Sequence, residues 1–458
     1  MGKLFGTDGV RGLAGEKLSP ELAFNLGKAF AYILKTRSEK DIATPTDKPV
    51  VLIGKDTRIS GDMLEAAIVS GFTSMGVSVI LAEVVPTPGV AFLIKKHKAH
   101  AGVVISASHN PFMDNGIKFF DKDGYKLSDE LENEIEETVL NSIPLEASKY
   151  ENIGYKKALA TANEEYKDFL LNSIKIDDLK GLKIAIDCAN GATSSVTPML
   201  FEALSSDFSL IHAEPNGVNI NENCGCTHMD SIALFVKENN MDIGIAYDGD
   251  GDRCLLIDEL GNTIDGDMIM SICAKYMKDN GTLKNNTLVT TIMSNLGLFI
   301  MGEKEGITVE KTDVGDKYVL ERLLKTGTNF GGEQSGHFIF LDYNTTGDGI
   351  LTSLYVLKIM KETGKKLSEL NKVMKVLPQV LVNAKVSAEN KHSYMENAEI
   401  KAEIEKLEKK FDGKGRVLIR PSGTENLVRV LIEGEDETEI LTEANNLKNL
   451  LEVKLCAE

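Results

Sequence analysis

The stretch Val50-Val-Leu-Ile-Gly-Lys-Asp-Thr-Arg-Ile-Ser-Gly61 predicts a buried β-strand that runs into a polar turn. A helical pattern over residues 63–75 follows, and a second apolar strand covers residues 77–81. After a further helix, the strand at residues 102–105 leads into the loop Ser106-Ala-Ser-His-Asn-Pro111. Short apolar strands that alternate with helices indicate an α/β fold with a largely parallel sheet.

The same pattern of strand, polar turn and helix recurs twice more along the chain. The second round begins with the strand 183–187 and ends with the strand 242–246, just before Asp248-Gly-Asp-Gly-Asp-Arg253. The third begins with the strand 287–292 and ends in the loop Gly331-Gly-Glu-Gln-Ser-Gly-His337. Because α/β folds bind ligands where their strands end, each round delivers one loop of chemical interest. We therefore predict three related α/β domains, with mixed but largely parallel sheets, around a shared cleft.

The last part of the chain has a different pattern. A strand at residues 380–386 and a charged helix at 396–410 precede two further strands, 416–419 and 427–432. Antiparallel strands combined with helices predict a smaller C-terminal α+β domain. We place the four domains at residues 1–155, 156–255, 256–370 and 371–458.

Composition limits the kinds of partner. The 458 residues carry a formal net charge of −18, with 42% hydrophobic and 26% charged residues. At about 150 residues per domain this length suggests several domains, and the acidity argues against nucleic acid or an anionic membrane as partner. The six cysteines show no paired pattern, and we expect free thiols in a reducing cytoplasm. We find no signal-peptide core at the N-terminus and no apolar run that could span a bilayer.

Three carboxylates at alternate positions, Asp248, Asp250 and Asp252, indicate a site for a hard divalent cation. Their spacing resembles an EF-hand, but the sixth position is Arg253 instead of glycine, and the flanking residues read as strands instead of helices. An acidic surface turn is the simpler alternative. Against it, three like charges between two buried strands repel one another unless a cation offsets them.

Ser108 follows a buried strand and stands among polar residues, which makes its hydroxyl a candidate phosphoryl acceptor. A cation held by the carboxylates could neutralise a phosphorylated serine, so the two loops together predict phosphoryl transfer through a covalent phosphoserine. His109 and Lys118 are the candidate proton-transfer groups. Loop hydrogen bonding and simple charge complementarity remain alternative roles for these two residues.

Two further loops offer groups that suit a sugar phosphate. The turn Arg420-Pro-Ser-Gly-Thr424, together with Arg429, offers guanidinium, hydroxyl and backbone donors for a phosphate. Glu333, Ser335 and His337 form a compact set of donors and acceptors that suits a polyhydroxylated ligand. The loop around them lacks the lysine of a P-loop. For the Arg420 turn the alternative is a simple surface hairpin. For the loop with Glu333 the alternative is a polar loop that only caps its own backbone.

Cys224-Gly-Cys226, with His228 beside it, could be half of a zinc site. Structural zinc sites usually have two-residue spacers and a second pair of ligands, and this sequence shows neither. We therefore do not expect zinc at these residues.

Five motifs in order carry a resemblance to a known family. They are Phe5-Gly-Thr-Asp-Gly-Val-Arg-Gly12, the SASHNP loop, the DGDGDR loop, the GGEQSGH loop and Arg420-Pro-Ser-Gly-Thr-Glu425. Over essentially its whole length, the chain resembles the α-D-phosphohexomutase superfamily, and within it the bacterial branch that acts on glucosamine phosphates. Cys226 and Asn426 depart from the pattern of that branch, at positions to which no chemistry is assigned.

The resemblance implies four domains around a deep cleft and a role for each candidate residue. It implies a phosphoserine at Ser108, and one Mg²⁺ held by Ser108, Asp248, Asp250 and Asp252. Beside the transferring phosphoryl group it implies Arg11, Lys118 and Arg253. It implies that the sugar is bound by Glu333, Ser335 and His337, and the distal phosphate by Arg420, Ser422, Gly423, Thr424 and Arg429.

The implied reaction interconverts glucosamine 6-phosphate and glucosamine 1-phosphate. It passes through a bound glucosamine 1,6-bisphosphate, which is also a candidate activator. The reaction would serve UDP-N-acetylglucosamine and peptidoglycan precursor synthesis in the cytoplasm. Its partner is a small hexosamine phosphate, and a homodimer is a candidate assembly. The alternatives are a phosphoglucomutase or phosphomannomutase with the same loops, and a non-catalytic sugar-phosphate sensor.

Overall fold

The computed structural model describes residues 4–6, 8–41, 48–422 and 425–456. The chain divides into two compact units. The first comprises Met1–Ile292 and Glu310–Asn371, and the second comprises Met293–Val309 and Lys372–Glu458. Each unit is therefore built from two separate segments of the chain.

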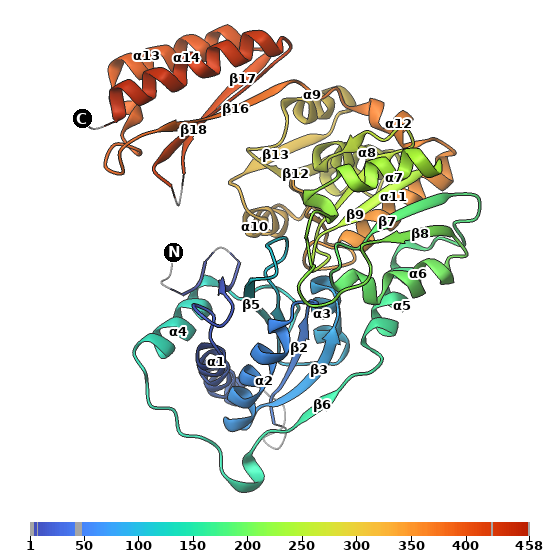
Figure 1. The fold of residues 1–458 in the computed structure, drawn as a ribbon, viewed down its shortest axis with the longest axis vertical. Coiled ribbons are helices and arrows are strands. Elements are labelled where there is room, and N and C mark those ends of the chain that lie inside the picture. The colour runs from blue at the N-terminus through green and yellow to red at the C-terminus, as the bar shows by residue number, and fades with distance from the viewer. Residues whose placement is uncertain (1–3, 7, 42–47, 423–424, 457–458) are drawn as a thin grey trace. The chain divides into compact units, whose positions relative to one another are not determined.

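The first unit begins with a six-stranded mixed sheet in the order β1-β5-β4-β2-β3-β6 (Figure 1). Strands β2, β3, β4 and β6 are parallel, and β5 runs antiparallel to both β4 and β1. The strands are β1 (Val10–Leu13), β2 (Val50–Lys55), β3 (Ser78–Val84), β4 (Ala101–Ile105), β5 (Asp114–Asp121) and β6 (Lys156–Ala158). The helices are α1 (Pro20–Asp41), α2 (Ser60–Ser74), α3 (Thr87–Lys96) and α4 (Asp129–Leu140), with the 3-10 turn η1 (Tyr150–Asn152).

The packing of α1 against α2 depends on small residues where the helices cross. A Cβ atom on Gly71 would lie 2.3 Å from the carbonyl oxygen of Phe24, so only glycine permits this close approach. The apolar side chains of β2 and β4 are buried beneath these helices. The core therefore fixes the ends of both strands, from which the loops that contain Asp56 and Ser108 emerge.

The second sheet has five strands in the order β11-β10-β9-β7-β8. Its strands are β7 (Lys183–Asp187), β8 (Asp207–Ile211), β9 (Ile243–Tyr247), β10 (Cys254–Asp258) and β11 (Thr263–Ile264). The first three are parallel, and β10 turns back antiparallel to β9. The accompanying helical elements are α5 (Ala162–Ile174), η2 (Ala192–Ser195), α6 (Thr197–Ala203), η3 (Gly225–Thr227) and α7 (Asp230–Asn239). The DGDGDR loop is the connection between β9 and β10.

The third sheet has four strands in the order β13-β12-β14-β15. They are β12 (Thr287–Thr291), β13 (Thr308–Thr312), β14 (Phe330–Gly332) and β15 (Phe338–Phe340). The helical elements of this part of the chain are α8 (Gly266–Asp279), η4 (Lys284–Asn286), α9 (Leu296–Glu305), α10 (Asp316–Thr326), α11 (Gly349–Thr363), α12 (Leu367–Leu370) and η5 (Asn371–Val373). Helix α11 is buried along most of its length and packs against β9, β10, α5 and α8. It begins at the N-cap Asp348, whose side chain accepts a hydrogen bond from the backbone N–H of Leu351 at 2.9 Å.

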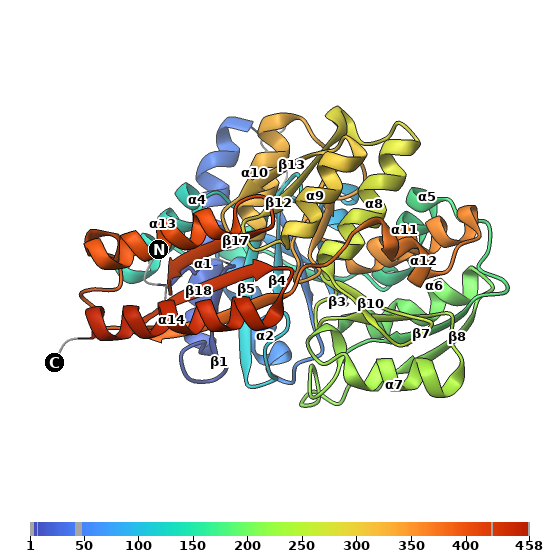
Figure 2. The same ribbon diagram turned by 90° about the horizontal axis from the view of Figure 1, so that it is seen from above.

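The second unit contains a three-stranded antiparallel sheet in the order β16-β18-β17, covered by two helices (Figure 2). Its elements are β16 (Gln379–Lys385), η6 (Tyr394–Glu396), α13 (Ala398–Phe411), β17 (Gly415–Pro421), β18 (Leu427–Gly434) and α14 (Glu437–Leu455). Helix α9 belongs to this unit. The residues before it are tied to the C-terminal segment, because Asn295 Nδ2 donates to Leu377 O at 2.9 Å and Arg416 Nη2 donates to Ser294 O at 2.6 Å.

The predicted fold class is confirmed. Mixed, largely parallel α/β sheets make up the first part of the chain, and a smaller α+β unit ends it. The limits of the four predicted domains stay a prediction. No helix among the described residues is both long and apolar enough to cross a membrane.

Candidate active site

Ser108 lies in the loop after β4 with its backbone in the left-handed region, at φ +53°. This conformation is uncommon for a residue other than glycine and marks a position under constraint. The buried hydroxyl donates a hydrogen bond to Asp248 Oδ2 at 2.6 Å, although the two residues are 140 positions apart. The structure therefore brings together the two loops that the sequence predicted to act together.

Two side chains hold the Ser108 loop by its carbonyl groups. The carbonyl oxygen of Ser108 accepts hydrogen bonds from Arg58 Nη2 at 3.2 Å and from Asn221 Nδ2 at 2.9 Å. The same two donors reach the carbonyl oxygen of Asn110, at 2.6 Å and 3.0 Å. Sequence reasoning missed both residues. Arg58 had a local signal, since it lies in the polar turn after β2, whereas Asn221 had none.

The three carboxylates form a buried cluster in which one oxygen of each lies within 4.8 Å of the others. Burial, and then the charges of Asp252 and Asp250, raise the pKa of Asp248 well above its ordinary value. Oδ1 of Asp250 and Oδ1 of Asp252 are buried and make no hydrogen bond to any described residue. An all-oxygen set with two unused oxygen atoms fits a hard divalent cation such as Mg²⁺. The triad could thus hold a metal ion.

Gly249, inside the triad, has to be glycine for the two loops to meet. A Cβ atom at this position would lie 2.7 Å from the carbonyl oxygen of Ser108 and 2.8 Å from Asn221 Nδ2. Both distances are shorter than real Cβ contacts allow. The glycine therefore permits the carboxylate loop to approach the serine loop.

Lys118, from β5, lies between the carboxylate triad and the N-terminal motif. Its Nζ is 2.9 Å from Asp250 Oδ2 and 3.0 Å from Asp8 Oδ2. Burial alone would lower the pKa of Lys118, but the charges of Asp250 and then Asp8 raise it above its ordinary value. Lys118 is therefore held as a cation, which favours charge complementarity over proton abstraction in this state. Arg11 forms an ion pair with Asp8, and its Nη1 lies 3.5 Å from the carbonyl oxygen of Ala107.

His109 places its Nδ1 3.4 Å from Ser108 Oγ. Burial, and then the positive charges of Arg253 and Arg11, lower the pKa of His109 to about 4. The imidazole is therefore neutral near pH 7 and can accept a proton. This geometry fits the predicted proton-transfer role, which stays a prediction.

Residues 333–337, which the sequence predicts to bind the sugar and which we call the sugar loop, lie between β14 and β15. They contact the carboxylate loop, residues 248–253, through a backbone bridge between Arg253 and His337. His337 is buried, and neither ring nitrogen makes a hydrogen bond within the described part of the chain. Burial raises the pKa of Glu333 above its ordinary value, and Ser335 is exposed. Two ring nitrogens without hydrogen bonds and a nearby carboxyl group suit the binding of hydroxyl groups.

A chain of alternating charges joins the carboxylate loop to the sugar loop. Lys118 bridges Asp250 and Asp8, and Lys126 Nζ lies 2.6 Å from Asp8 Oδ1. Lys126 also pairs with Asp316. This series of charged side chains ends at the sugar loop, since Asp316 Oδ2 lies 3.8 Å from His337 Nε2. Asp8 stood in the N-terminal motif without an assigned role, and neither Lys126 nor Asp316 had a signal in the sequence.

In the second unit, Arg420 and Arg429 lie directly opposite each other on β17 and β18. Like charges at such a pair are unfavourable unless an anion offsets them. Burial, and then the charge of Arg429, lower the pKa of Arg420, and Arg429 Nε is buried without a hydrogen bond to any described residue. Ser422 follows β17, and its Oγ accepts a hydrogen bond from the backbone N–H of Glu425 at 3.3 Å. Gly423 and Thr424, which were also predicted to bind phosphate, lie outside the described residues.

Comparison with known proteins matches four family models in order along the chain. All four carry the description phosphoglucomutase/phosphomannomutase. The alpha/beta/alpha domain I matches residues 2–144, domain II residues 164–261, domain III residues 265–377, and the C-terminal domain residues 381–449.

The chain belongs to the phosphoglucomutase/phosphomannomutase family.

Two curated members of this family show how similar the relatives are. The phosphoglucosamine mutase of Clostridium tetani is 54% identical over 455 residues, which are 99% of this chain and 100% of that protein. The phosphoglucosamine mutase of Caldicellulosiruptor saccharolyticus is 53% identical over 462 residues, with the same coverage. The predicted membership of the α-D-phosphohexomutase superfamily, close to phosphoglucosamine mutases, is confirmed.

Solved structures of the family share the fold at lower identity. A phosphoglucomutase/phosphomannomutase family protein from Burkholderia thailandensis has a TM-score of 0.81 and 20% identity, over 98% of this chain and 97% of that chain. Aspergillus fumigatus N-acetylphosphoglucosamine mutase, in complex with GlcNAc-6P and magnesium, has a TM-score of 0.67 and 17% identity. The match covers 99% of this chain and 96% of that chain. These likenesses support the family fold.

Proposed function

We propose that this chain is a phosphoglucosamine mutase, an isomerase that interconverts glucosamine 6-phosphate and glucosamine 1-phosphate. The observation that carries the proposal is the hydrogen bond from Ser108 Oγ to Asp248 Oδ2, within a carboxylate cluster that has oxygens left for a cation. A sensor would need the sugar and phosphate loops but neither a buried serine nor this cluster. The choice of glucosamine rests on relatives of that name that are 53–54% identical over the whole chain.

The proposed reaction begins with a phosphoryl group on Ser108. The O1 hydroxyl of glucosamine 6-phosphate attacks the phosphorus, the bond from phosphorus to Ser108 Oγ breaks, and the O1 proton passes to a base. His109, neutral and 3.4 Å from Oγ, is the candidate base. The products are glucosamine 1,6-bisphosphate and a free Ser108 hydroxyl, which takes up the proton that the base received.

The second half-reaction returns a phosphoryl group to the enzyme. After the bisphosphate has turned in the site, Ser108 Oγ attacks the phosphorus of the 6-phosphoryl group and the bond from phosphorus to O6 breaks. The proton lost by the serine hydroxyl passes to O6, and glucosamine 1-phosphate leaves. Asp248 Oδ2 accepts the hydrogen bond of this hydroxyl and so orients it. Added bisphosphate could phosphorylate an unmodified Ser108 in the same way and so act as an activator.

Charge complementarity around the transferring group is the main catalytic effect that we propose. Arg11, Lys118 and Arg253 supply positive charge beside Ser108. Ser108, Asp248, Asp250 and Asp252 would hold one Mg²⁺. When bound, this ion offsets negative charge on the phosphoryl group.

The remaining loops would read the two ends of the substrate. We propose that Glu333, Ser335 and His337 contact sugar hydroxyls. The phosphate that is not reacting would be held by Arg420, Ser422, Gly423, Thr424 and Arg429. A guanidinium and hydroxyl cradle reads phosphate alone, so it can accept either end of a ligand that must bind in two orientations.

Two measurements test the proposal. Phosphopeptide mass measurement should find the phosphoryl group on Ser108, and Ser108→Ala should lose mutase turnover by several orders of magnitude, up to about 10⁶-fold. Ser70→Ala, on the exposed face of α2, is the matched control and should keep full turnover. Near-normal turnover of Ser108→Ala would exclude the covalent route.

The substrate is tested by kcat/KM values for several hexose phosphates on one preparation. Glucosamine phosphate should lead glucose phosphate by about 10–100-fold, because a few polar contacts at C2 are worth about 1–3 kcal/mol. A preference for glucose or mannose phosphate would instead assign the phosphoglucomutase or phosphomannomutase reaction. We further propose a cytoplasmic location, which fractionation tests, and a homodimer, which light scattering tests.

A further inference from the structure

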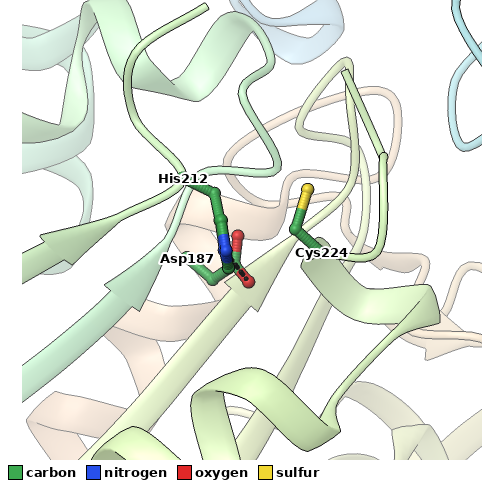
Figure 3. Close-up of side chains that lie close together, drawn as sticks. All are labelled: Asp187, His212 and Cys224. Atoms are coloured by element: carbon green, nitrogen blue, oxygen red, sulfur yellow. Dashed lines mark hydrogen bonds and ion pairs between the residues drawn. The ribbon is translucent and has the colours of Figure 1, made fainter. Parts of the chain in front are cut away.

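A second cluster of metal-ligating side chains lies in the second sheet, apart from the carboxylate triad. Asp187 ends β7, His212 follows β8, and Cys224 immediately precedes η3 (Figure 3). One ligand atom of each lies within 4.8 Å of the other two. Asp187 and Cys224 are buried and His212 is half-buried, so the cluster has one side open to water.

The separation of the first two ligands suits a single small ion. His212 Nδ1 lies 3.0 Å from Asp187 Oδ2. With bonds of about 2.0–2.2 Å to nitrogen and oxygen, two ligands of one tetrahedral zinc ion lie about 3.3–3.5 Å apart. His212 also has φ +45°, a left-handed conformation that is uncommon for histidine. An increase of a few tenths of an ångström in the distance between His212 Nδ1 and Asp187 Oδ2 would convert this hydrogen-bonded pair into a pair of ligands.

The donor set distinguishes this cluster from the triad. A carboxylate oxygen, an imidazole nitrogen and a thiol sulfur suit zinc and its neighbours in the transition series, whereas Mg²⁺ prefers oxygen alone. We propose that Asp187, His212 and Cys224 bind one zinc-class divalent cation, with water in the fourth position. Cys226 and His228, which the sequence placed beside Cys224, are not members of this cluster.

A simpler role for Asp187 is to order its own loop. Its carboxylate also accepts hydrogen bonds from the backbone N–H groups of Ala189 at 2.8 Å and Gly225 at 2.9 Å. These bonds are compatible with metal binding, because the oxygens of a ligating carboxylate commonly accept further hydrogen bonds. In the loop-ordering role the sulfur of Cys224 only accepts a weak hydrogen bond from Asn190 Nδ2 at 4.0 Å, whereas in the metal site it is a ligand. An experiment that detects a bond between metal and sulfur distinguishes the two roles.

The proton balance of binding follows from the surroundings of each ligand. Burial, and then the charges of Asp187 and Glu222, raise the pKa of Cys224 to about 12, so the thiol keeps its proton when no metal is bound. Binding would form bonds from the metal to oxygen, nitrogen and sulfur, replace the hydrogen bond between His212 and Asp187, and release the thiol proton to solvent. At least one proton should therefore leave for each ion bound.

The cluster would stabilise loops that reach the serine site. Asn190, three residues after Asp187, accepts a hydrogen bond from Thr57 Oγ1 at its carbonyl oxygen, at 2.6 Å. Asn221, three residues before Cys224, donates to the Ser108 loop. An ion that joins the ends of β7 and β8 to the start of η3 would therefore stiffen the segments that carry both asparagines.

The test is zinc binding to the metal-stripped full-length protein in excess Mg²⁺, which occupies the all-oxygen site. Equilibrium dialysis should give one zinc ion per chain, calorimetry in two buffers should show proton release, and Tm should rise. With Co²⁺ as the probe, a charge-transfer band should report a bond between metal and thiolate. Cys224→Ser and His212→Gln should each weaken zinc binding by at least about 10–100-fold, the loss seen even for indirect partners of a metal.

Two control variants separate this site from adventitious thiol binding. Cys226→Ser removes a buried thiol two residues away, and Cys456→Ser removes the exposed thiol. Both should keep one tightly bound zinc ion and the cobalt–thiolate band. Persistence of that band in Cys224→Ser, or zinc binding equal in wild type and Cys224→Ser, would overturn the proposal. If Cys224→Ser is unfolded by circular dichroism, His212→Gln decides, and unchanged zinc affinity in that variant would likewise overturn it.

Discussion

Asn221 Nδ2 donates a hydrogen bond to the carbonyl oxygen of Ser108 at 2.9 Å, across 113 residues of sequence. A side chain from the loop before η3 thereby supports the backbone of the candidate nucleophile, which follows β4 in another sheet. Because Ser108 has φ +53°, its conformation has to be maintained by its neighbours. Arg58 donates to the same oxygen from the side of the first sheet, so the loop is held from two directions.

Asn221→Ala should lower kcat by about 10–100-fold while KM changes little, because a misplaced nucleophile loses its alignment with the phosphoryl group. Steady-state kinetics and Tm on one preparation check this. Asn239→Ala removes an asparagine from the exposed end of α7 and is the matched control. An unchanged kcat in Asn221→Ala would show that Arg58 alone holds the loop.

Lys118→Met should destabilise the protein by about 3–5 kcal/mol, because the buried carboxylate of Asp250 loses the cation that lies 2.9 Å from it. Denaturant unfolding measures the change in free energy. Adding Asp250→Asn to this variant should recover part of the loss, because it removes the buried charge that Lys118 no longer offsets. Lys317→Met, which breaks an ion pair with exposed Asp129, should cost under about 1 kcal/mol. An equally small effect for Lys118→Met would contradict a buried charge network.

Chelation should abolish mutase activity, and added Mg²⁺ should restore it. Asp250→Asn should weaken Mg²⁺ binding, because one of the three carboxylates that we propose as ligands becomes a neutral amide. Titration of activity against free Mg²⁺ checks both statements, with Asp242→Asn, on a loop before β9, as the control. Full activity in excess chelator would exclude the metal assignment.

Arg429→Ala should lower kcat/KM by about 10–100-fold, and equally for glucosamine and glucose phosphates, because it would remove the charged hydrogen bond to phosphate that we propose for this residue. Inorganic phosphate should raise the Tm of the wild type and have a smaller effect on this variant. Arg322→Ala, on α10, serves as the control. A loss that differs between the two sugars would indicate that Arg429 reads the sugar.

Asp348 should make stability fall as pH rises through the weakly acidic range. Burial raises the pKa of Asp348 to about 6 in the folded protein, against about 3.9 in an unfolded chain. Between these two pKa values the folded state binds more protons than the unfolded state does. About 2–3 kcal/mol of the free energy of unfolding that is present near pH 4 is therefore lost above pH 6. Unfolding curves of wild type and Asp348→Asn, compared at each pH, isolate this effect. A difference between the two proteins that does not vary with pH would exclude the raised pKa.

The parts of the molecule that could be predicted from sequence are those encoded in short runs of residues. The apolar runs at β2, β7 and β12 and the loops that follow strands are local patterns, and each was predicted near its observed position. The meeting of Ser108 with Asp248 followed from the rule that α/β folds use the ends of their strands. Chemistry that is complete within one loop is therefore visible without a structure.

The residues that sequence reasoning missed act through partners that are distant along the chain. Asn221 is an ordinary loop asparagine until Ser108 is placed beside it, and Lys126 meets Asp316 across 190 residues. In the sequence Cys224 stands beside Cys226 and His228, whereas in space it forms a cluster with Asp187 and His212. No local pattern encodes such pairs, since they arise only when separate sheets are assembled.

The division of the second unit into residues 293–309 and 372–458 has a consequence for synthesis on the ribosome. Helix α9 and the residues before it emerge long before β17, whose Arg416 donates to the carbonyl oxygen of Ser294. A nascent chain therefore lacks this bond until its C-terminal strands have been translated. Premature termination after the third sheet would leave Ser294 and Asn295 without those C-terminal partners, which exposes such a fragment to aggregation and proteolysis.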